Sequence, residues 1–175
     1  MQVEAKWYYN GYTPSFEEYI NNAWSSISGP VIQVHAYFLL GENIAKEALE
    51  WLKDYPDLIR WSSMAFRFAN DLGTSTDELE RGDVSKSVQC FMHESGVSEK
   101  IALEHIKHLI AELWKKMNKD RVSSRFPQLF TSFAINIPRA AQCIYQYGDG
   151  YGVPDIDTKE QVLSLFIEPI PLIED

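Results

Sequence analysis

Positive charge is scarce in this chain. Its 175 residues hold 16 lysines and arginines against 25 aspartates and glutamates, for a formal net charge of -9. Proteins that bind nucleic acid neutralise backbone phosphates with a basic surface. The composition therefore argues against nucleic acid as a partner. Any anionic ligand must be held locally, by a few placed cations or by a metal ion.

Cysteine and long apolar runs are also scarce. The two cysteines, Cys90 and Cys143, form no CxxC pair, which argues against a disulfide framework or a zinc site and predicts two buried thiols. No apolar run approaches the ~20 residues that span a bilayer. The first residues, MQVEAKWYY, form neither a secretory signal nor a basic, Ser-rich transit peptide. We therefore predict no membrane segment and no targeting signal in this chain.

Few segments have the sequence pattern of a β-strand, and the proline, glycine and capping residues between apolar segments are those that begin and end helices. A hydrophobic content of 45% is enough to bury a core. We predict an all-α chain that forms one unit, because no linker is long enough to divide it. The expected helices cover residues 14–27, 30–40, 42–53, 56–81, 98–119, 128–147 and 158–168.

Local signals mark where several of these helices begin. Thr13 is the expected N-cap of the first helix, with Pro14 at its first helical position. The SGP stretch at residues 28–30 should break the chain between the first two helices, since glycine lowers helix stability and proline lacks a backbone N–H. Thr158 and Gln161 fit a capping box that would start the last helix.

The stretch NDLGTSTDE, residues 70–78, places an amide, a hydroxyl and a carboxylate at steps of four. At about 100° per residue, Thr74 lies about 40° and Glu78 about 80° from Asn70, so the three share one stripe of a helix. Such hard oxygen donors suit Mg²⁺, whereas Ca²⁺ fits less well because only one donor is anionic. Arg67, at about 60°, offers a bidentate fork to a phosphate. A metal and an arginine on one stripe predict a diphosphate ligand.

A polar stripe can also be an ordinary solvated helix face, and short motifs of this kind often match by chance. Two details favour a binding site. Gly73 and the β-branched Thr74 are poor choices for a helix that is merely exposed. Apolar residues precede the stripe, which places Asn70 near a buried wall.

The stretch at residues 70–78 resembles the second metal motif of class I terpene synthases, (N/D)D(L/I/V)x(S/T)xxxE. Longer stretches are similar to plant monoterpene synthases of the angiosperm type, and the agreement runs from about Glu4 to Leu172. They are EAKWYYNGYTPSFEEYINNAWSSISGP, RWSSMAFRFANDLGTSTDELERGD, QCFMHESGVSEKIA, WKKMNKDR, AAQCIYQYGDGYG and LSLFIEPIPL. The resemblance implies that the chain forms part of the class I terpenoid synthase α-helical bundle.

The resemblance implies roles for single residues. Asn70, Thr74 and Glu78 are expected to ligate one Mg²⁺, or Mn²⁺ in its place. Arg67, and Lys86 in the stretch RGDVSKS, are expected to bind the substrate diphosphate and to assist its departure as catalytic cations.

Further roles follow from the same resemblance. Asp71 matches an aspartate that does not ligate the metal and is expected to support the ligands or the helix. The break at Ile27-Ser28-Gly29 is similar to one whose freed carbonyls face the active-site cavity and stabilise positive charge. The loop Tyr147-Gly148-Asp149-Gly150 resembles one that closes over bound substrate, with an ordinary surface loop as the alternative.

The implied substrate is geranyl diphosphate, which ionises to an allylic carbocation and becomes a monoterpene. Metal ions and Arg or Lys donors neutralise the departing diphosphate, and an aromatic-lined pocket excludes water. Candidates for that lining are Trp24, Ile27, Tyr37, Phe66 and Tyr147, although aromatics at helical spacing are more often core. The resemblance places the parent enzyme in the plastid.

The aspartate-rich DDxxD cluster of this family does not occur in these residues. We therefore expect residues 1–175 to be the carboxy-terminal portion of the metal-binding domain, without its aspartate-rich half or the amino-terminal domain, and to show no turnover alone. A sesquiterpene or isoprene synthase is the near alternative. A non-catalytic helical protein that binds a partner is the alternative from another class.

Overall fold

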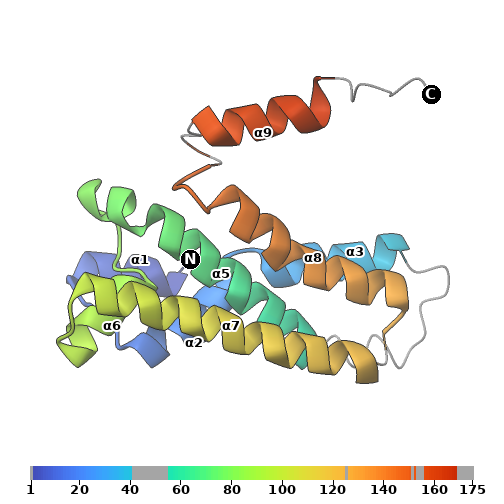
Figure 1. Cartoon of the computed structure of the whole chain (residues 1–175). Helices are drawn as coiled ribbons and strands as arrows, with labels where there is room; N and C mark the ends of the chain where they lie inside the picture. The colour runs from blue at the N-terminus through green and yellow to red at the C-terminus, as the bar shows by residue number, and fades with distance from the viewer. Residues whose placement is uncertain (1, 41–54, 125, 151, 153–155, 169–175) are drawn as a thin grey trace.

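Helices make up most of the described chain (Figure 1). The computed structural model describes residues 2–40, 55–124, 126–150, 152 and 156–168. In chain order the helices are α1 (Gln2–Asn10), α2 (Phe16–Ser26), α3 (Gly29–Leu40), α5 (Asp57–Glu80), α6 (Ser87–Ser95), α7 (Glu99–Ser123), α8 (Gln128–Ile144) and α9 (Ile156–Phe166). The described residues contain no strand, so the all-α prediction is confirmed. The helix expected over residues 42–53 lies outside the described residues.

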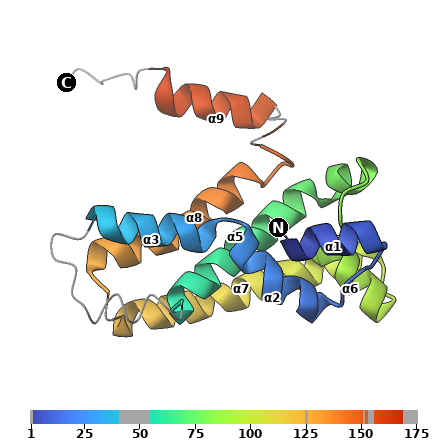
Figure 2. The same ribbon diagram turned by 180° about the vertical axis from the view of Figure 1, so that it is seen from behind.

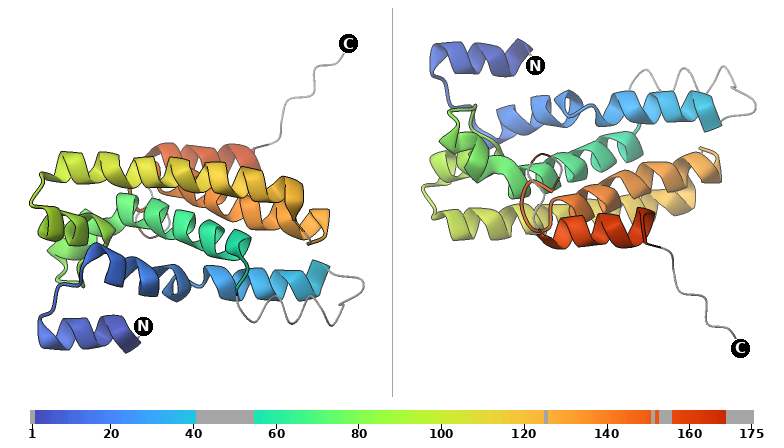
Figure 3. Two further views of the ribbon diagram at one scale, coloured as in Figure 1. Left: turned by 90° about the horizontal axis from the view of Figure 1, so that it is seen from below. Right: turned by 90° about the horizontal axis from the view of Figure 1, so that it is seen from above.

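Helix α5 occupies the centre of the bundle. It packs against α2, α3, α6, α7 and α8, and Figure 3 shows it between the row formed by α2 and α3 and the pair formed by α7 and α8. One main hydrophobic core joins α2, α5, α6, α7 and α8. Its buried members are Tyr19, Ile20, Ala23, Leu58, Ala65, Phe68, Val88, Cys90, Ala102, Ile106, Ile110, Leu113, Met117, Ala134 and Ile135. Any polar group carried by the inner half of α5 is therefore held in a rigid setting.

The predicted break near residue 28 is confirmed as the junction of α2 and α3, which lie end to end (Figure 2). Ser28 has a φ of 69°, a left-handed conformation that a residue with a side chain rarely adopts and that ends a helix. A Cβ on Gly29 would lie 2.5 Å from the Ser63 Oγ atom of α5. The glycine therefore allows α3 to approach the central helix closely.

Two helix starts differ from the prediction. The N-cap of α2 is Ser15, not Thr13, because the Ser15 hydroxyl accepts from the Glu18 N–H at 3.2 Å and the Glu18 carboxylate accepts from the Ser15 N–H at 2.9 Å. Helix α9 begins at Ile156, so Thr158 lies within its first turn and does not cap it. The local patterns also failed to predict α1, which buries none of its residues.

The prediction for the cysteines is half correct. Neither forms a disulfide, and Cys90 is buried, but Cys143 is exposed on α8 because that side of the helix faces away from the core. Burial and the negative charge of Asp71 raise the pKa of the Cys90 thiol to about 12. Among the described residues, no helix has the length and apolar character to cross a membrane.

Candidate functional site

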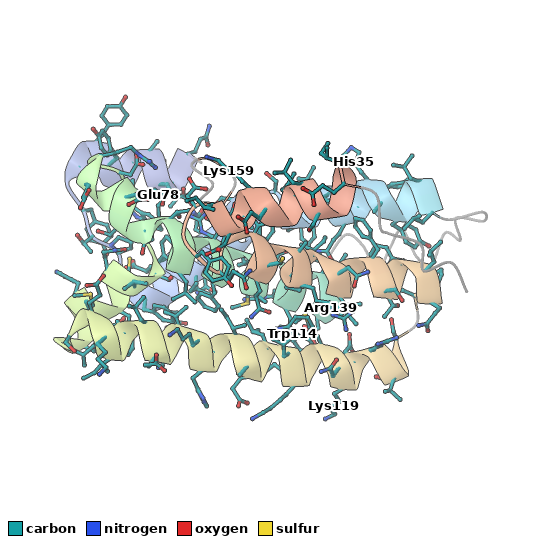
Figure 4. All side chains as sticks on the ribbon, turned by 45° about the horizontal axis from the view of Figure 1, so that its top comes forward. His35, Glu78, Trp114, Lys119, Arg139 and Lys159 are labelled. Carbon is teal, nitrogen blue, oxygen red and sulfur yellow. The ribbon has the colours of Figure 1, made fainter. Side chains whose placement is uncertain are left out.

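The stretch of residues 70–78 lies in the C-terminal half of α5, and its predicted helical conformation is confirmed. Thr74 is 3% exposed, the Glu78 side chain is 19% exposed, and Asn70 is partly buried. Figure 4 shows Glu78 towards the C-terminal end of α5. None of the three donors extends into bulk solvent, so an ordinary solvated face does not describe this stripe.

The Thr74 hydroxyl has its proton engaged inside the helix. It donates to the Asn70 carbonyl at 3.0 Å, and because a hydroxyl carries two lone pairs, the Thr74 oxygen can still accept from a donor or bind a cation. The described residues contain no cluster of three His, Cys, Asp or Glu side chains that could hold a metal. A metal ion at this stripe would therefore be held by mixed donors: an amide, a hydroxyl and a carboxylate.

Lys86 and Glu78, two of the predicted site residues, lie next to each other in the structure. The Lys86 Nζ atom lies 3.5 Å from Glu78 Oε2, and both side chains are mostly buried. That Glu78 oxygen is buried and has no hydrogen-bond partner. Lys86 directly precedes α6, and its backbone N–H donates to the Gln89 side chain at 3.1 Å, which fixes the start of that helix. The Lys86 ammonium group thus lies beside the Glu78 carboxylate, which can still accept hydrogen bonds or bind a cation.

Arg67 and Asp71 form a buried ion pair one turn apart on α5. The Arg67 Nε atom lies 3.1 Å from Asp71 Oδ1 and donates to the Tyr19 hydroxyl at 2.8 Å. The Tyr19 hydroxyl in turn donates to Asp71 Oδ2 at 2.8 Å. Asp71 Oδ2 also accepts from the Ser87 N–H at 3.2 Å. The contacts of Asp71 are thus with Arg67, Tyr19 and Ser87 and not with Thr74 or Glu78, and its role as a supporting residue stays a prediction.

The charges in this network stabilise one another. Burial alone would lower the pKa of Arg67, but the carboxylate of Asp71, followed by Tyr19, raises it, so the guanidinium stays charged. Burial first and the Asp71 charge second raise the pKa of Tyr19 well above its ordinary value, so the phenol keeps its proton. The Arg67 Nη2 atom is buried and has no hydrogen-bond partner. The Nη2 group of Arg67 thus keeps hydrogen-bonding capacity that the described residues do not use.

The loop after α8 lies against α5 beside the stripe. A Cβ on Gly73 would lie 2.7 Å from the Gly148 carbonyl oxygen and 2.9 Å from Tyr145. Tyr147, in this loop, is 56% exposed, and the Asp149 carboxylate accepts from the Gly152 N–H at 2.9 Å. In the described part of the chain, no hydrogen bond or ion pair joins the Tyr147 and Asp149 side chains to Asn70, Thr74 or Glu78. The loop is adjacent to the site, and its closure over substrate stays a prediction.

Replacing Gly73 with alanine should destabilise the chain by about 1–3 kcal/mol, because the added methyl group would overlap the backbone of the loop. Urea unfolding followed by circular dichroism measures the change. Asp77→Ala, at an exposed position of the same helix, serves as the control and should stay within about 0.5 kcal/mol. A gain in stability would contradict the close contact, since alanine normally stabilises an exposed helix relative to glycine.

The helix break contacts α5 one turn before Arg67. Gln33 is fully buried, and its side-chain amide donates to the Gly29 carbonyl at 3.3 Å and to the Ser63 hydroxyl at 3.1 Å. The Ser28 carbonyl accepts from the Ile32 N–H at 2.9 Å. Two carbonyls of the Ile27-Ser28-Gly29 break therefore already have a donor each, and any role in stabilising positive charge falls to their remaining lone pairs.

The proposed aromatic lining is only partly compatible with the structure. Tyr37 is 4% exposed and belongs to a small second core with Ile59 and Phe130, so it packs as a core residue. Trp24 is partly buried, with the Arg60 guanidinium 5.4 Å from its ring centroid. Figure 4 also labels Trp114 of α7 and Arg139 of α8, and the Arg139 guanidinium carbon lies 5.7 Å from the centroid of the Trp114 ring.

Two residues of the network were not expected from the sequence. Tyr19 was not singled out, because a buried tyrosine on the apolar face of α2 looks like plain core. Ser87 contributes through its backbone N–H, which no side-chain pattern reveals. The spacing of Arg67 and Asp71, four residues on one helix, is the one signal that could have predicted their ion pair.

Comparison with known proteins gives concordant results. The family model described as the metal binding domain of the terpene synthase family matches residues 1–116. Terpene synthase 10 of Ricinus communis is 60% identical over 97% of this chain, which covers 31% of that relative. The chloroplastic myrcene synthase of Quercus ilex is 59% identical over 99% of this chain, which covers 29% of that relative. The chain thus spans about a third of the length of these relatives.

Solved structures show the same arrangement of helices. A limonene synthase crystallised with 2-fluorolinalyl diphosphate has a TM-score of 0.93 and 46% identity, with 97% of this chain and 32% of that chain covered. The isoprene synthase of grey poplar, crystallised with three Mg²⁺ ions and dimethylallyl-S-thiolodiphosphate, has a TM-score of 0.88 and 44% identity, with 98% and 33% covered. The described helices therefore adopt the fold of these enzymes.

Proposed function

This chain belongs to the terpene synthase family, a family of lyases, and we propose that it is the metal-binding portion of a Mg²⁺-dependent enzyme that converts geranyl diphosphate to a monoterpene. One observation carries the proposal. The buried Nη2 atom of Arg67 has no hydrogen-bond partner, and Arg67 lies on the same helix as Asn70, Thr74 and Glu78. A buried guanidinium with an unused N–H group is suited to bind an oxyanion such as diphosphate.

The residues present fit a divalent cation of the magnesium type. Asn70, Thr74 and Glu78 can supply oxygen donors, and the buried Oε2 atom of Glu78, which has an ion pair with Lys86 but no hydrogen bond, is the kind of ligand that Mg²⁺ prefers. We propose these three as the ligands, with Mn²⁺ as a substitute. When bound, such an ion supplies positive charge that stabilises the departing diphosphate.

The side chains of this chain would act on the leaving group. The bond between the allylic carbon and the diphosphate oxygen breaks, and its electron pair leaves with the diphosphate. Arg67 and Lys86 would hold the diphosphate and donate hydrogen bonds to the oxygens on which negative charge develops. The allylic cation then becomes a neutral monoterpene by losing a proton to a base such as water or the released diphosphate, either directly or after it has added a water molecule. Asp71 would keep Arg67 charged and aimed during this step.

Geranyl diphosphate is the substrate that the relatives support best. Myrcene and terpineol synthases are 59% and 58% identical to this chain, and the relatives' names place several of them in the chloroplast. We therefore propose a plastid location for the parent enzyme. The isoprene synthase, which binds a shorter diphosphate analogue, is the second candidate because its fold agrees nearly as well. A purely non-catalytic helical module is disfavoured by the family membership.

Titration of inorganic pyrophosphate into the 175-residue chain, followed by calorimetry, tests the proposal. We expect saturable binding that Mg²⁺ strengthens by about 5- to 150-fold, the range typical of coupled ligands, after subtraction of a titration into buffer with Mg²⁺. Absence of binding, or the same affinity without Mg²⁺, would contradict the proposed site. Competition by geranyl and dimethylallyl thiolodiphosphates then ranks the two substrate candidates, and the geranyl analogue should compete better because it buries more apolar surface.

A further inference from the structure

Tyr19 connects α2 to the central helix through its hydroxyl group. The side chain is fully buried, and the residue lies 52 positions before Asp71 in the sequence. Its hydroxyl accepts from Arg67 Nε and donates to Asp71 Oδ2, each at 2.8 Å. The Arg67 guanidinium carbon also lies 5.5 Å from the centroid of the Tyr19 ring. Tyr19 therefore fixes both the position and the plane of the guanidinium.

The same Asp71 oxygen reaches the start of α6. Besides Tyr19, Asp71 Oδ2 accepts from the Ser87 N–H at 3.2 Å. Ser87 is the first residue of α6 and directly follows Lys86, whose ammonium group lies by Glu78. One carboxylate oxygen thus links the segment that carries Lys86 to the tyrosine that holds Arg67.

We propose that Tyr19 is a positioning residue for diphosphate binding: it holds Arg67 directly and the Lys86 segment through Asp71, and so keeps the two at a fixed spacing. The proposal rests on the proposed function of the Arg67 and Lys86 site. A hydroxyl that lies between a charged donor and a charged acceptor cannot be replaced by the aromatic ring alone, since the ring offers no hydrogen bond.

Loss of the Tyr19 hydroxyl should increase the mobility of the Arg67 side chain without breaking its ion pair with Asp71. In Tyr19→Phe, Arg67 Nε would keep its ion pair with Asp71 Oδ1 at 3.1 Å but would lose the hydroxyl that accepts its hydrogen bond. The guanidinium would then sample more orientations, and its Nη2 atom would be aimed less often at the ligand. Partners that orient a binding group from behind typically contribute about 10- to 100-fold to affinity, so we expect about a tenfold loss.

The test compares Tyr19→Phe with Tyr12→Phe in the 175-residue chain, with inorganic pyrophosphate and Mg²⁺ as the probe. Tyr12 is a matched control, because its hydroxyl also donates to a carboxylate, Glu18, at 2.8 Å, but on the exposed side of the bundle. We expect Tyr19→Phe to weaken binding about tenfold and Tyr12→Phe to leave it unchanged. Circular dichroism at the titration temperature confirms that both variants are folded.

A double-mutant cycle separates positioning from general loosening of the core. If Tyr19 acts through Arg67, Tyr19→Phe should have little further effect in an Arg67→Lys background, whereas a merely structural role would give additive losses. Ser87→Pro provides a second, independent variant, because it removes the N–H that Asp71 accepts at a helix position where proline is tolerated. It should weaken binding as well, even if Tyr19→Phe fails to fold.

The outcomes are distinct. If the unmodified chain does not bind pyrophosphate with Mg²⁺, the proposed function fails, and this inference fails with it. If the unmodified chain binds and Tyr19→Phe binds equally well, only the role of Tyr19 is overturned. Additive losses in the cycle, or unchanged binding by folded Ser87→Pro, would overturn the coupling through Asp71.

Discussion

Replacing Asp71 with alanine is expected to lower the free energy of unfolding of this chain by about 3–5 kcal/mol, the usual effect of removing one partner of a buried ion pair. Asp71 is fully buried, and Arg67 is 7% exposed. Alanine would leave the guanidinium without its countercharge, Tyr19 without its acceptor, and the first N–H of α6 unpaired. Urea unfolding at constant temperature, followed by far-ultraviolet circular dichroism, measures the change.

The matched control is Asp77→Ala, which removes the same group from an exposed position of the same helix. Surface substitutions of this kind usually stay within about 0.5 kcal/mol. A loss below about 1 kcal/mol for Asp71→Ala, the median worth of a surface pair, would mean that the Arg67 pair is solvated in solution. In that case the positioning role assigned to this network could not hold.

The fold could be predicted from the sequence where two local signals agreed. The apolar pattern and its flanking Pro56 and Gly82 predicted residues 56–81, and α5 covers Asp57–Glu80. The cap of α2 could not be predicted, because Thr13 with Pro14 and Ser15 with Glu18 are competing start signals. The structure favours Ser15, since the Glu18 carboxylate also accepts from the Tyr12 hydroxyl at 2.8 Å. Helix α1 has no buried residue, so no apolar period marked it.

The sequence predicts which candidate site residues share one face of α5, but it does not predict the contacts between α5 and the neighbouring helices. Helical geometry alone groups Asn70, Thr74 and Glu78, and the position of Lys86 came only from the family resemblance. The contacts of Tyr19 join segments about 50 residues apart, and no local pattern distinguishes a tyrosine that holds an arginine from one that fills the core. The network around Asp71 therefore had to be read from the packing of α2, α5 and α6.

The buried polar network costs stability that an apolar core would not. A buried ion pair is often no more stabilising than well-packed hydrophobic residues, and the unpartnered Arg67 Nη2 and Ser87 hydroxyl add the cost of unsatisfied polar groups. Polar groups held in this way are typical of sites in which a ligand completes the hydrogen bonds. The unpartnered Arg67 Nη2 therefore supports the proposed diphosphate site, where a ligand would supply the missing acceptor.

Replacing Glu78 with glutamine should remove most of the Mg²⁺-dependent binding of pyrophosphate. Glu78 is the only anionic donor among the three proposed ligands, and Mg²⁺ sites depend on carboxylate charge. Loss of a group that merely supports a ligand costs about 10- to 100-fold in metal affinity, so loss of the charged ligand itself should cost at least about 100-fold. Calorimetric titration of pyrophosphate at a fixed Mg²⁺ concentration measures the effect.

The glutamine variant keeps the shape of the side chain, so the comparison isolates its charge. Glu80→Gln removes the same charge from an exposed residue two positions later on α5, and its affinity should equal that of the unmodified chain. Equal losses in both variants would point to a general effect of net charge on an anion, and unchanged binding in Glu78→Gln would exclude Glu78 as a ligand. We expect the affinities of the two variants to differ sharply. The Glu78 oxygen is buried next to Lys86, so its charge would act on the ion with little screening by water. The charge of Glu80 is exposed and is screened by water and salt.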